Sequence, residues 1–171
     1  EFAHGIGRYA LNLALSIGRM DTANRYLVLL NDPARFAPLA GFRNFSPVIT
    51  RARLYSAAEQ VILPLLLRRK GVDLYHSTGF SIPAIHVCPS VMTIHDLIHL
   101  KFRGDYTIFH RLYYELIVKS GAGNCSAVIT VSRSSMADLK DFLRIGGDRL
   151  KVIYNGIGDE FSPAPRAIGE R

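Results

Sequence analysis

Short apolar segments alternate with longer segments of helical periodicity along most of this chain, and this alternation constrains the fold more than any other feature. The expected strands are residues 25–31, 45–50, 72–76, 90–94, 127–131 and 151–154. The expected helices are residues 6–17, 54–69, 105–121 and 134–143. Such alternation is typical of a doubly wound α/β fold, in which helices cover both faces of a mostly parallel sheet. Residues 25–31 are therefore expected to be buried on both faces.

Glycine, proline and serine set the expected ends of the helices. Gly18 is expected to end the first helix, and Pro64 to kink or break the second. Ser132 or Ser134 is expected to cap the last helix through its hydroxyl. Residues 5–10 fit the pattern G-x-G-x-x-A and are read as a loop that opens the first helix. Such a loop brings backbone N–H groups to a phosphate, although a tight turn explains the pattern equally well.

A dinucleotide-binding site is one alternative for this glycine pattern. Such a site places an acidic residue on the ribose, at the end of the next strand. Asp32 has that position, 27 residues after Gly5, which is a little late for the role. The chain has no G-x-S-x-G elbow, P-loop or H-E-x-x-H motif, so the sequence gives no support to hydrolases or P-loop nucleotide hydrolases.

Polar residues follow the expected strands at the positions where a doubly wound sheet binds its ligands. In such sheets the site lies beyond the carboxyl ends of the parallel strands. The residues at these positions are Asn31-Asp32, His76-Ser77-Thr78, His95-Asp96, Ser132-Arg133 and Asn155-Gly156. We expect them to lie along one edge of the sheet.

His95, Asp96 and His99 follow an apolar strand, and three interpretations compete for them. Two histidines four apart can bind a metal ion from one face of a helix. Residues 92–100 resemble a strand that runs into a loop, however, and no third ligand is identifiable, so no metal site is expected. A structural histidine is the second interpretation. The third, which we favour, is a functional His95 that hydrogen-bonds a hydroxyl or phosphate group near neutral pH.

The chain is basic, with 21 Lys and Arg residues against 14 Asp and Glu residues and a net charge of +7. This charge is compatible with nucleic acid, an anionic membrane or phosphorylated small molecules as partners. No nucleic-acid-binding motif accompanies it, so nucleic acid is not expected. Residues 65–70, LLLRRK, allow a peripheral membrane contact, but the basic end of a helix packed on the sheet is the favoured interpretation.

Two further features bear on the location of the protein. No apolar run approaches the roughly 20 residues that cross a bilayer. Cys88 and Cys125 match no metal-binding spacing and are expected to be reduced, structural residues. We therefore expect a cytoplasmic protein, with peripheral contact to the cytoplasmic face of the membrane as an open possibility.

Taken together, the motifs resemble the retaining glycosyltransferases of family 4, which have a GT-B fold. The matching stretches are GIGRYALNL, VDLYHSTGFSIP, PSVMTIHDLIHL, FHRLYYEL, AVITVSRSSMADL and KVIYNGIGDEFSP. The resemblance implies two Rossmann-like domains across a cleft, the first for the acceptor and the second for the nucleotide sugar. Residues 1–158 match the first, with an apparently truncated first strand, and residues 159–171 match the start of the interdomain linker. The family's two donor-site glutamates, eight residues apart, have no counterpart in this chain.

The same resemblance assigns roles to individual residues. Gly5 and Gly7 would lie under the donor diphosphate, and His95 would be the catalytic residue beside the reacting sugar. Asp96 would lie next to His95 in the cleft. Arg8 would contact phosphate or acceptor. His76 and Ser132, at the ends of two other strands, complete the expected cleft.

The resemblance implies an enzyme that transfers a hexose or deoxyhexose, as mannosyl- and rhamnosyl-type enzymes do, from a nucleotide sugar to a carbohydrate or lipid-linked acceptor. It implies retention of anomeric configuration, a role in polysaccharide biosynthesis, and no cofactor or metal ion. This domain alone is expected to be inactive without the second domain. Two alternatives remain: a dinucleotide (NAD-type) binding domain, and a non-catalytic module that binds an anionic membrane or nucleic acid.

Overall fold

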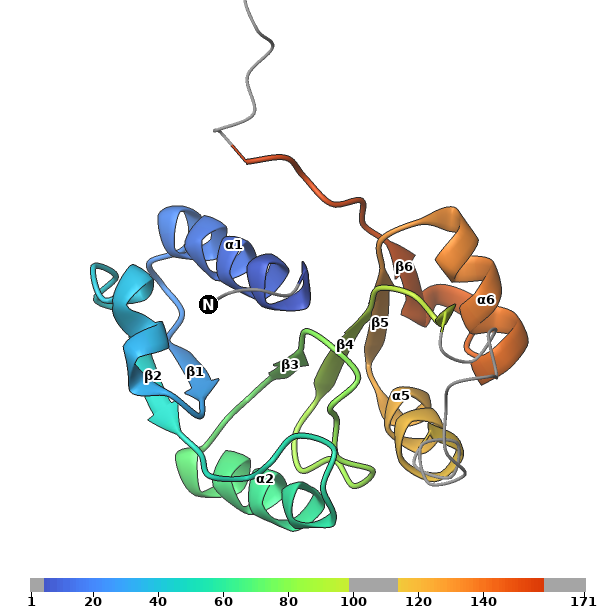
Figure 1. The fold of residues 1–171 in the computed structure, drawn as a ribbon, viewed down its shortest axis with the longest axis horizontal. Coiled ribbons are helices and arrows are strands. Elements are labelled where there is room, and N and C mark those ends of the chain that lie inside the picture. The colour runs from blue at the N-terminus through green and yellow to red at the C-terminus, as the bar shows by residue number, and fades with distance from the viewer. Residues whose placement is uncertain (1–4, 99–113, 159–171) are drawn as a thin grey trace, which may run out of the picture.

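Parallel strands form two sheets in the computed structural model, which describes residues 5–98 and 114–158. The strands are β1 (Tyr26–Leu30), β2 (Phe45–Ile49), β3 (Tyr75–Ser77), β4 (Ser90–Ile94), β5 (Ala127–Thr130) and β6 (Leu150–Val152). The α-helices are α1 (Gly5–Met20), α2 (Ala57–Lys70), α5 (Lys119–Asn124) and α6 (Arg133–Leu143). A π-helical turn (Tyr114–Val118) precedes α5, and the 3-10 helices are Pro33–Leu39 and Gly147–Arg149. These elements confirm the expected α/β fold with parallel strands (Figure 1).

The larger sheet, in the order β3-β4-β5-β6, carries the hydrophobic core. Met92 and Ile94 of β4 and Val128 of β5 are fully buried. They pack with Leu139 of α6 and Val118, which precedes α5. Burial of each such side chain contributes about 1.5–3 kcal/mol to the stability of the folded state. The packing of these side chains therefore holds β4 in place.

The smaller sheet pairs β1 with β2, and β1 differs from its expected environment. Residues 26–30, YLVLL, are apolar throughout, yet all five are only half-buried. The prediction of burial on both faces is therefore wrong. The physical reason is that β1 pairs with β2 along one edge, and the described residues supply no strand for its other edge. Stacking of Tyr26 on Phe45, with ring centroids 4.7 Å apart, covers part of the pair.

Helix α1 extends beyond its expected end. Gly18 lies within the helix and is buried, so it does not terminate α1. A Cβ atom at Gly18 would lie 2.8 Å from the ring of Phe42, which indicates that glycine is needed there for packing. The glycine therefore reflects a tertiary contact and not a helix end.

Helix α2 also runs through its predicted break. It begins after Ser56, whose hydroxyl accepts a hydrogen bond from the Glu59 N–H, and it continues past Pro64. It ends at Gly71, which has a left-handed backbone conformation with φ of 60°. That conformation favours glycine, so Gly71 sets the end of α2.

The remaining predictions have mixed outcomes. Strand β4 has the expected bounds, whereas β3 and β6 are shorter than expected. Ser132 caps α6, which confirms the first of the two candidates. The helix expected at residues 105–121 is described only from residue 114, and the linker expected at residues 159–171 lies outside the described residues.

Candidate functional site

A hollow of about 400 Å³ lies where the N-terminus of α1 meets the ends of the larger sheet. Its walls come from three parts of the chain: α1, the residues after β4, and the segment after β6. The lining residues are Gly5, Ile6, Tyr9, His95, Asp96 and Asn155. The prediction that polar residues gather at this edge is met for His95, Asp96 and Asn155.

His95 directly follows the last residue of β4, and its imidazole is held in place on two sides. Nε2 lies 3.2 Å from the carbonyl oxygen of Thr78. Because a carbonyl can only accept, Nε2 must carry the hydrogen, and the neutral ring then has its lone pair on Nδ1. The ring also meets the edge of the Tyr9 ring, with centroids 4.7 Å apart and planes at 85°. The described residues give Nδ1 no partner, so it is available to a ligand.

The backbone of His95 is fixed as well. Its carbonyl oxygen accepts a hydrogen bond of 2.9 Å from the Ser135 hydroxyl. The Ser132 hydroxyl donates to Ser135 Oγ at 2.9 Å and accepts from the Ser135 N–H at 3.0 Å. Ser132 therefore supports the site through Ser135 and α6, and it does not line the hollow.

Behind the hollow, Thr93 joins two aromatic side chains. Its hydroxyl lies 2.9 Å from Nε2 of His76 and 3.4 Å from the Tyr9 hydroxyl. Thr93 is fully buried, and burial lowers the pKa of His76 below its ordinary value, which favours the neutral ring. His76, which was expected in the cleft, therefore lies behind the wall and is not among the residues that line the hollow.

The sequence interpretation did not identify Tyr9 and Thr93. The sequence could have indicated Tyr9, because this residue lies four positions after Gly5 and therefore on the same face of α1. The indication for Thr93 is weaker: it lies two positions before His95, and residues two apart along a strand point to the same face of the sheet. Their contact spans 84 residues of sequence, which no local pattern reports.

The two glycines lie in the first turn of α1 and not in a loop before it. A Cβ atom on Gly5 or Gly7 would have nothing within 4 Å, so the described neighbours do not require glycine at either position. The first N–H groups of a helix lack intrahelical partners and carry partial positive charge. No acidic residue lies in this turn, so it can accept an anion. Gly5 lines the hollow, whereas Gly7 and the exposed Arg8 do not.

Asp96 and Asn155 complete the polar wall. Oδ1 of Asp96 accepts a hydrogen bond of 3.1 Å from the Ile98 N–H, which fixes the carboxylate at the start of the following loop. Asn155 is exposed and follows β6. Together with His95 they offer hydrogen-bond acceptors and an amide opposite the positive end of α1.

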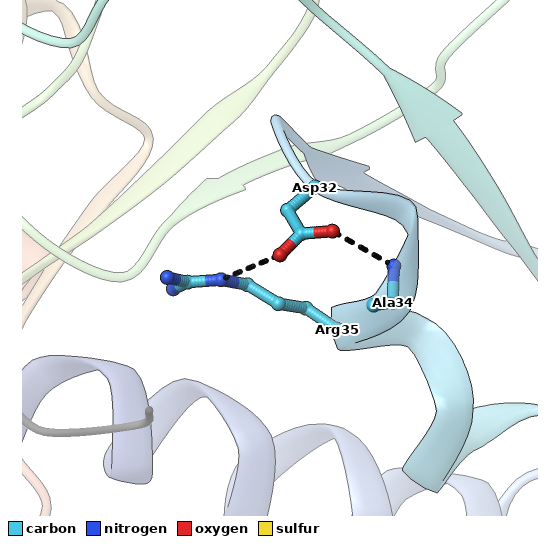
Figure 2. A network of polar contacts seen from close by, with 3 residues as sticks. All are labelled: Asp32, Ala34 and Arg35. Carbon is cyan, nitrogen blue, oxygen red and sulfur yellow. Dashed lines mark hydrogen bonds and ion pairs between the residues drawn. The ribbon is translucent and has the colours of Figure 1, made fainter.

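Asp32 is not among the residues that line this hollow. Figure 2 shows its carboxylate between the Ala34 N–H, at 3.0 Å, and Nε of Arg35, at 3.8 Å. The carboxylate caps the 3-10 helix that begins at Pro33. This capping role accounts for Asp32 without a ribose ligand.

Metal and membrane-spanning sites receive no support in the described part of the chain. No group of three or more His, Cys, Asp or Glu side chains there could hold a metal ion, and His99 lies outside the described residues.

Burial raises the pKa of the Cys125 thiol to about 12 and also raises the pKa of the Cys88 thiol. None of the helices in residues 5–98 and 114–158 combines the length and apolar character needed to cross a bilayer.

The model of the family described as Glycosyltransferase Family 4 matches residues 3–161, which span both sheets and every residue of the hollow. A search of curated proteins found no match.

Proposed function

Because the chain belongs to glycosyltransferase family 4 and is a glycosyltransferase domain, we propose that the hollow at α1 and His95 is one wall of its sugar-transfer site. In this proposal the donor is a nucleotide sugar, and its diphosphate lies against the first turn of α1. Two observations support this position: open space at Gly5 and the absence of acidic residues in the turn. The first N–H groups of an α-helix also lack intrahelical partners in general, so they can donate to an anion.

His95 is proposed to lie beside the reacting sugar. The Thr78 carbonyl orients its ring so that Nδ1 is free to accept a hydrogen bond from a sugar or acceptor hydroxyl. A histidine held in this way positions a hydroxyl without having to remove its proton. The chemical step is proposed to depend mainly on stabilisation of the departing diphosphate by the helix N-terminus.

The finer assignments are also proposals. The transferred group is a hexose or deoxyhexose, the acceptor is a carbohydrate or lipid-linked molecule, and the reaction retains configuration without a metal ion or cofactor. The family resemblance supports these assignments. Because the glutamates at positions 1, 59, 115, 160 and 170 include no pair eight apart, a second domain is proposed to hold the donor nucleotide. The chain alone is therefore proposed to bind ligands weakly and not to turn them over.

The two free thiols, one of them fully buried, support the proposed cytoplasmic location. A role there in polysaccharide biosynthesis is proposed from the family resemblance alone. The proposed assignment rests most on one observation, the placement of His95 opposite the first turn of α1 in the same hollow.

Amide and imidazole NMR signals test this assignment directly. Titration with pyrophosphate, which mimics the donor's diphosphate leaving group, is expected to shift the amides of Gly5, Ile6 and Gly7. Titration with acceptor saccharides is expected to shift the His95 ring signals. Unchanged signals at both places, or stoichiometric binding of NAD with shifts near Asp32, would contradict the proposal.

A further inference from the structure

A chain of three polar side chains crosses the larger sheet behind the hollow. Its first member is His76 of β3, which lies opposite Val91 of β4. Thr93 follows Val91 by two residues and therefore shares a face of the sheet with His76. Nε2 of His76 lies 2.9 Å from the Thr93 hydroxyl, which lies 3.4 Å from the hydroxyl of Tyr9 in α1. Tyr9 lines the hollow, so the chain ends at the site.

Tyr9 extends to the place where the diphosphate is proposed to lie. Long side chains of an α-helix point back towards its N-terminus and cover the preceding turn. Tyr9 follows Gly5 by four residues, and both line the hollow. A ligand at the first turn of α1 would therefore lie against the Tyr9 side chain as well as against the first N–H groups of the helix.

The Thr93 hydroxyl permits two arrangements of protons along this chain. Thr93 is fully buried, so its single proton needs an acceptor, and the described residues offer two: Nε2 of His76 and the Tyr9 oxygen. In the inward arrangement Tyr9 donates to Thr93, Thr93 donates to Nε2, and the His76 proton lies on Nδ1. In the outward arrangement Nε2–H donates to Thr93, Thr93 donates to Tyr9, and the Tyr9 proton is directed to the hollow.

A neutral His76 can adopt either arrangement. Burial lowers the pKa of His76, which keeps its ring neutral near pH 7, and within residues 5–98 and 114–158 its Nδ1 has no hydrogen-bond partner. Both arrangements contain the same number of protons. They differ in which ring nitrogen carries the proton and in the direction of the two hydroxyl groups. Tyr9 therefore offers the hollow only an acceptor in the inward arrangement and a donor in the outward one.

We propose that Tyr9 binds the anionic ligand of the sugar-transfer site as a hydrogen-bond donor, with His76 and Thr93 as positioning residues that hold the outward arrangement. This inference rests on the function proposed above and adds one side-chain donor to it. A deprotonated phosphate oxygen only accepts, so it selects the arrangement in which the Tyr9 proton points to the hollow. When the chain changes from inward to outward, Nδ1 of His76 releases a proton to water and Nε2 takes one up, so the charge of the protein stays the same.

A purely structural role for the chain has a different signature. The link between Tyr9 and Thr93 also holds α1 against the sheet, and its loss would lower stability whether or not a ligand binds. A structural link gives a ligand at α1 no means of setting the tautomer of His76 on β3. The tautomer of His76 in the complex therefore separates the two roles.

Long-range proton–nitrogen NMR spectra of the histidine rings report which nitrogen carries the proton. In the complex with pyrophosphate, His76 is expected in the Nε2–H form, and a mixture of tautomers in the free protein should shift to it. Tyr9→Phe and Thr93→Val should remove this effect of pyrophosphate, while Thr93→Ser, which keeps the hydroxyl, should retain it. Tyr26→Phe, which loses a hydroxyl on β1 outside the hollow, is the matched control and should behave as the parent.

Pyrophosphate affinity, measured from the amide shifts of Gly5 and Gly7, gives a second readout. Tyr9→Phe is expected to weaken binding roughly tenfold, the effect of losing one hydrogen bond to a charged group. Thr93→Val should also weaken binding, Thr93→Ser should restore it, and Tyr26→Phe should leave it unchanged. Thermal unfolding checks that each variant is folded, and Tyr9→Phe with Thr93→Ser still tests the inference if Thr93→Val does not fold.

The outcomes separate this inference from the function on which it rests. Equal pyrophosphate affinity for Tyr9→Phe and Tyr26→Phe, or a His76 proton on Nδ1 in the complex, would overturn the role of Tyr9 while the amide shifts of α1 still support the proposed function. Amides of α1 that do not respond to pyrophosphate in the parent would overturn both.

Discussion

The edge of the Tyr9 ring meets the ring of His95 at nearly a right angle, with centroids 4.7 Å apart. One ring comes from the first helix and the other from the end of a central strand, 86 positions later in the sequence. The contact therefore joins α1 to the larger sheet at the hollow itself.

Removing the Tyr9 ring should release the His95 imidazole. Tyr9→Ala is expected to shift the His95 ring signals in NMR spectra and to lower stability by at least about 0.5–1.5 kcal/mol, the contribution of an aromatic pair beyond its buried area. Tyr9→Phe keeps the ring and loses only the long 3.4 Å contact with Thr93, so its His95 signals should stay near those of the parent. Identical spectra for Tyr9→Ala and the parent would show that the contact does not order His95.

Gly5→Ala should weaken pyrophosphate binding without lowering the stability of the fold. The added Cβ meets open space, and alanine is favoured in helices by up to about 1 kcal/mol, so urea unfolding should show equal or higher stability. The same Cβ would crowd a diphosphate at the helix end, so the pyrophosphate response should fall. Gly123→Ala in α5, also with open space at its Cβ, is the control, and it should leave that response unchanged. A pyrophosphate response in Gly5→Ala equal to that of the parent would argue against the proposed contact.

Gly18→Ala should have the opposite effect on stability. Its Cβ would approach the Phe42 ring to 2.8 Å, and the ring is packed against Phe45 with centroids 5.6 Å apart. Overpacking of this kind typically costs about 1–3 kcal/mol, which thermal unfolding would detect. Gly18→Ala combined with Phe42→Leu should recover part of the loss. A Gly18→Ala protein as stable as its parent would mean that Phe42 moves freely.

His76 should make stability depend on pH. Burial lowers the pKa of His76 in the folded state, so the unfolded state binds a proton more readily as the pH falls through about 6.5. The contribution of His76 is therefore fully present above that pH and is lost progressively below it. Urea unfolding at pH 7.5 and pH 5.5 should show lower stability at the acidic pH.

His76→Gln should reduce this pH dependence. Burial also lowers the pKa of His86, which acts in the same direction, so part of the dependence should remain in the variant. Asp21, whose pKa is lowered mainly by a hydrogen bond from Tyr26, contributes only at more acidic pH. An identical pH dependence in His76→Gln and the parent would contradict the role of His76.

The sequence correctly predicted the structural features that depend on neighbouring residues in the chain. The apolar run from Ser90 to Ile94 is bounded by a proline and a polar pair, and the strand has those limits. Ser132 caps its helix because its hydroxyl reaches the N–H three residues later, a contact within one turn. His95 and Asp96 reach the site because parallel strands end at a common edge.

Distant contacts determined the features that local patterns missed. Gly18 resembles a helix end until Phe42, 24 residues later, is seen to occupy the space beside it. The half-burial of β1 depends on which strands pair with it, which its own sequence does not specify. Thr93 gained its place in the site through partners on α1 and β3.

The double attachment of His95 has a thermodynamic consequence. Its ring is bonded to the segment after β3 and its backbone to α6, so both are ordered when the chain folds. When binding orders a mobile side chain, the lost entropy typically costs about 0.5–1.5 kcal/mol. For His95 this cost arises during folding, before a ligand binds. Calorimetry of a ligand that contacts His95 should therefore show a small entropic penalty from the protein, which Tyr9→Ala would enlarge.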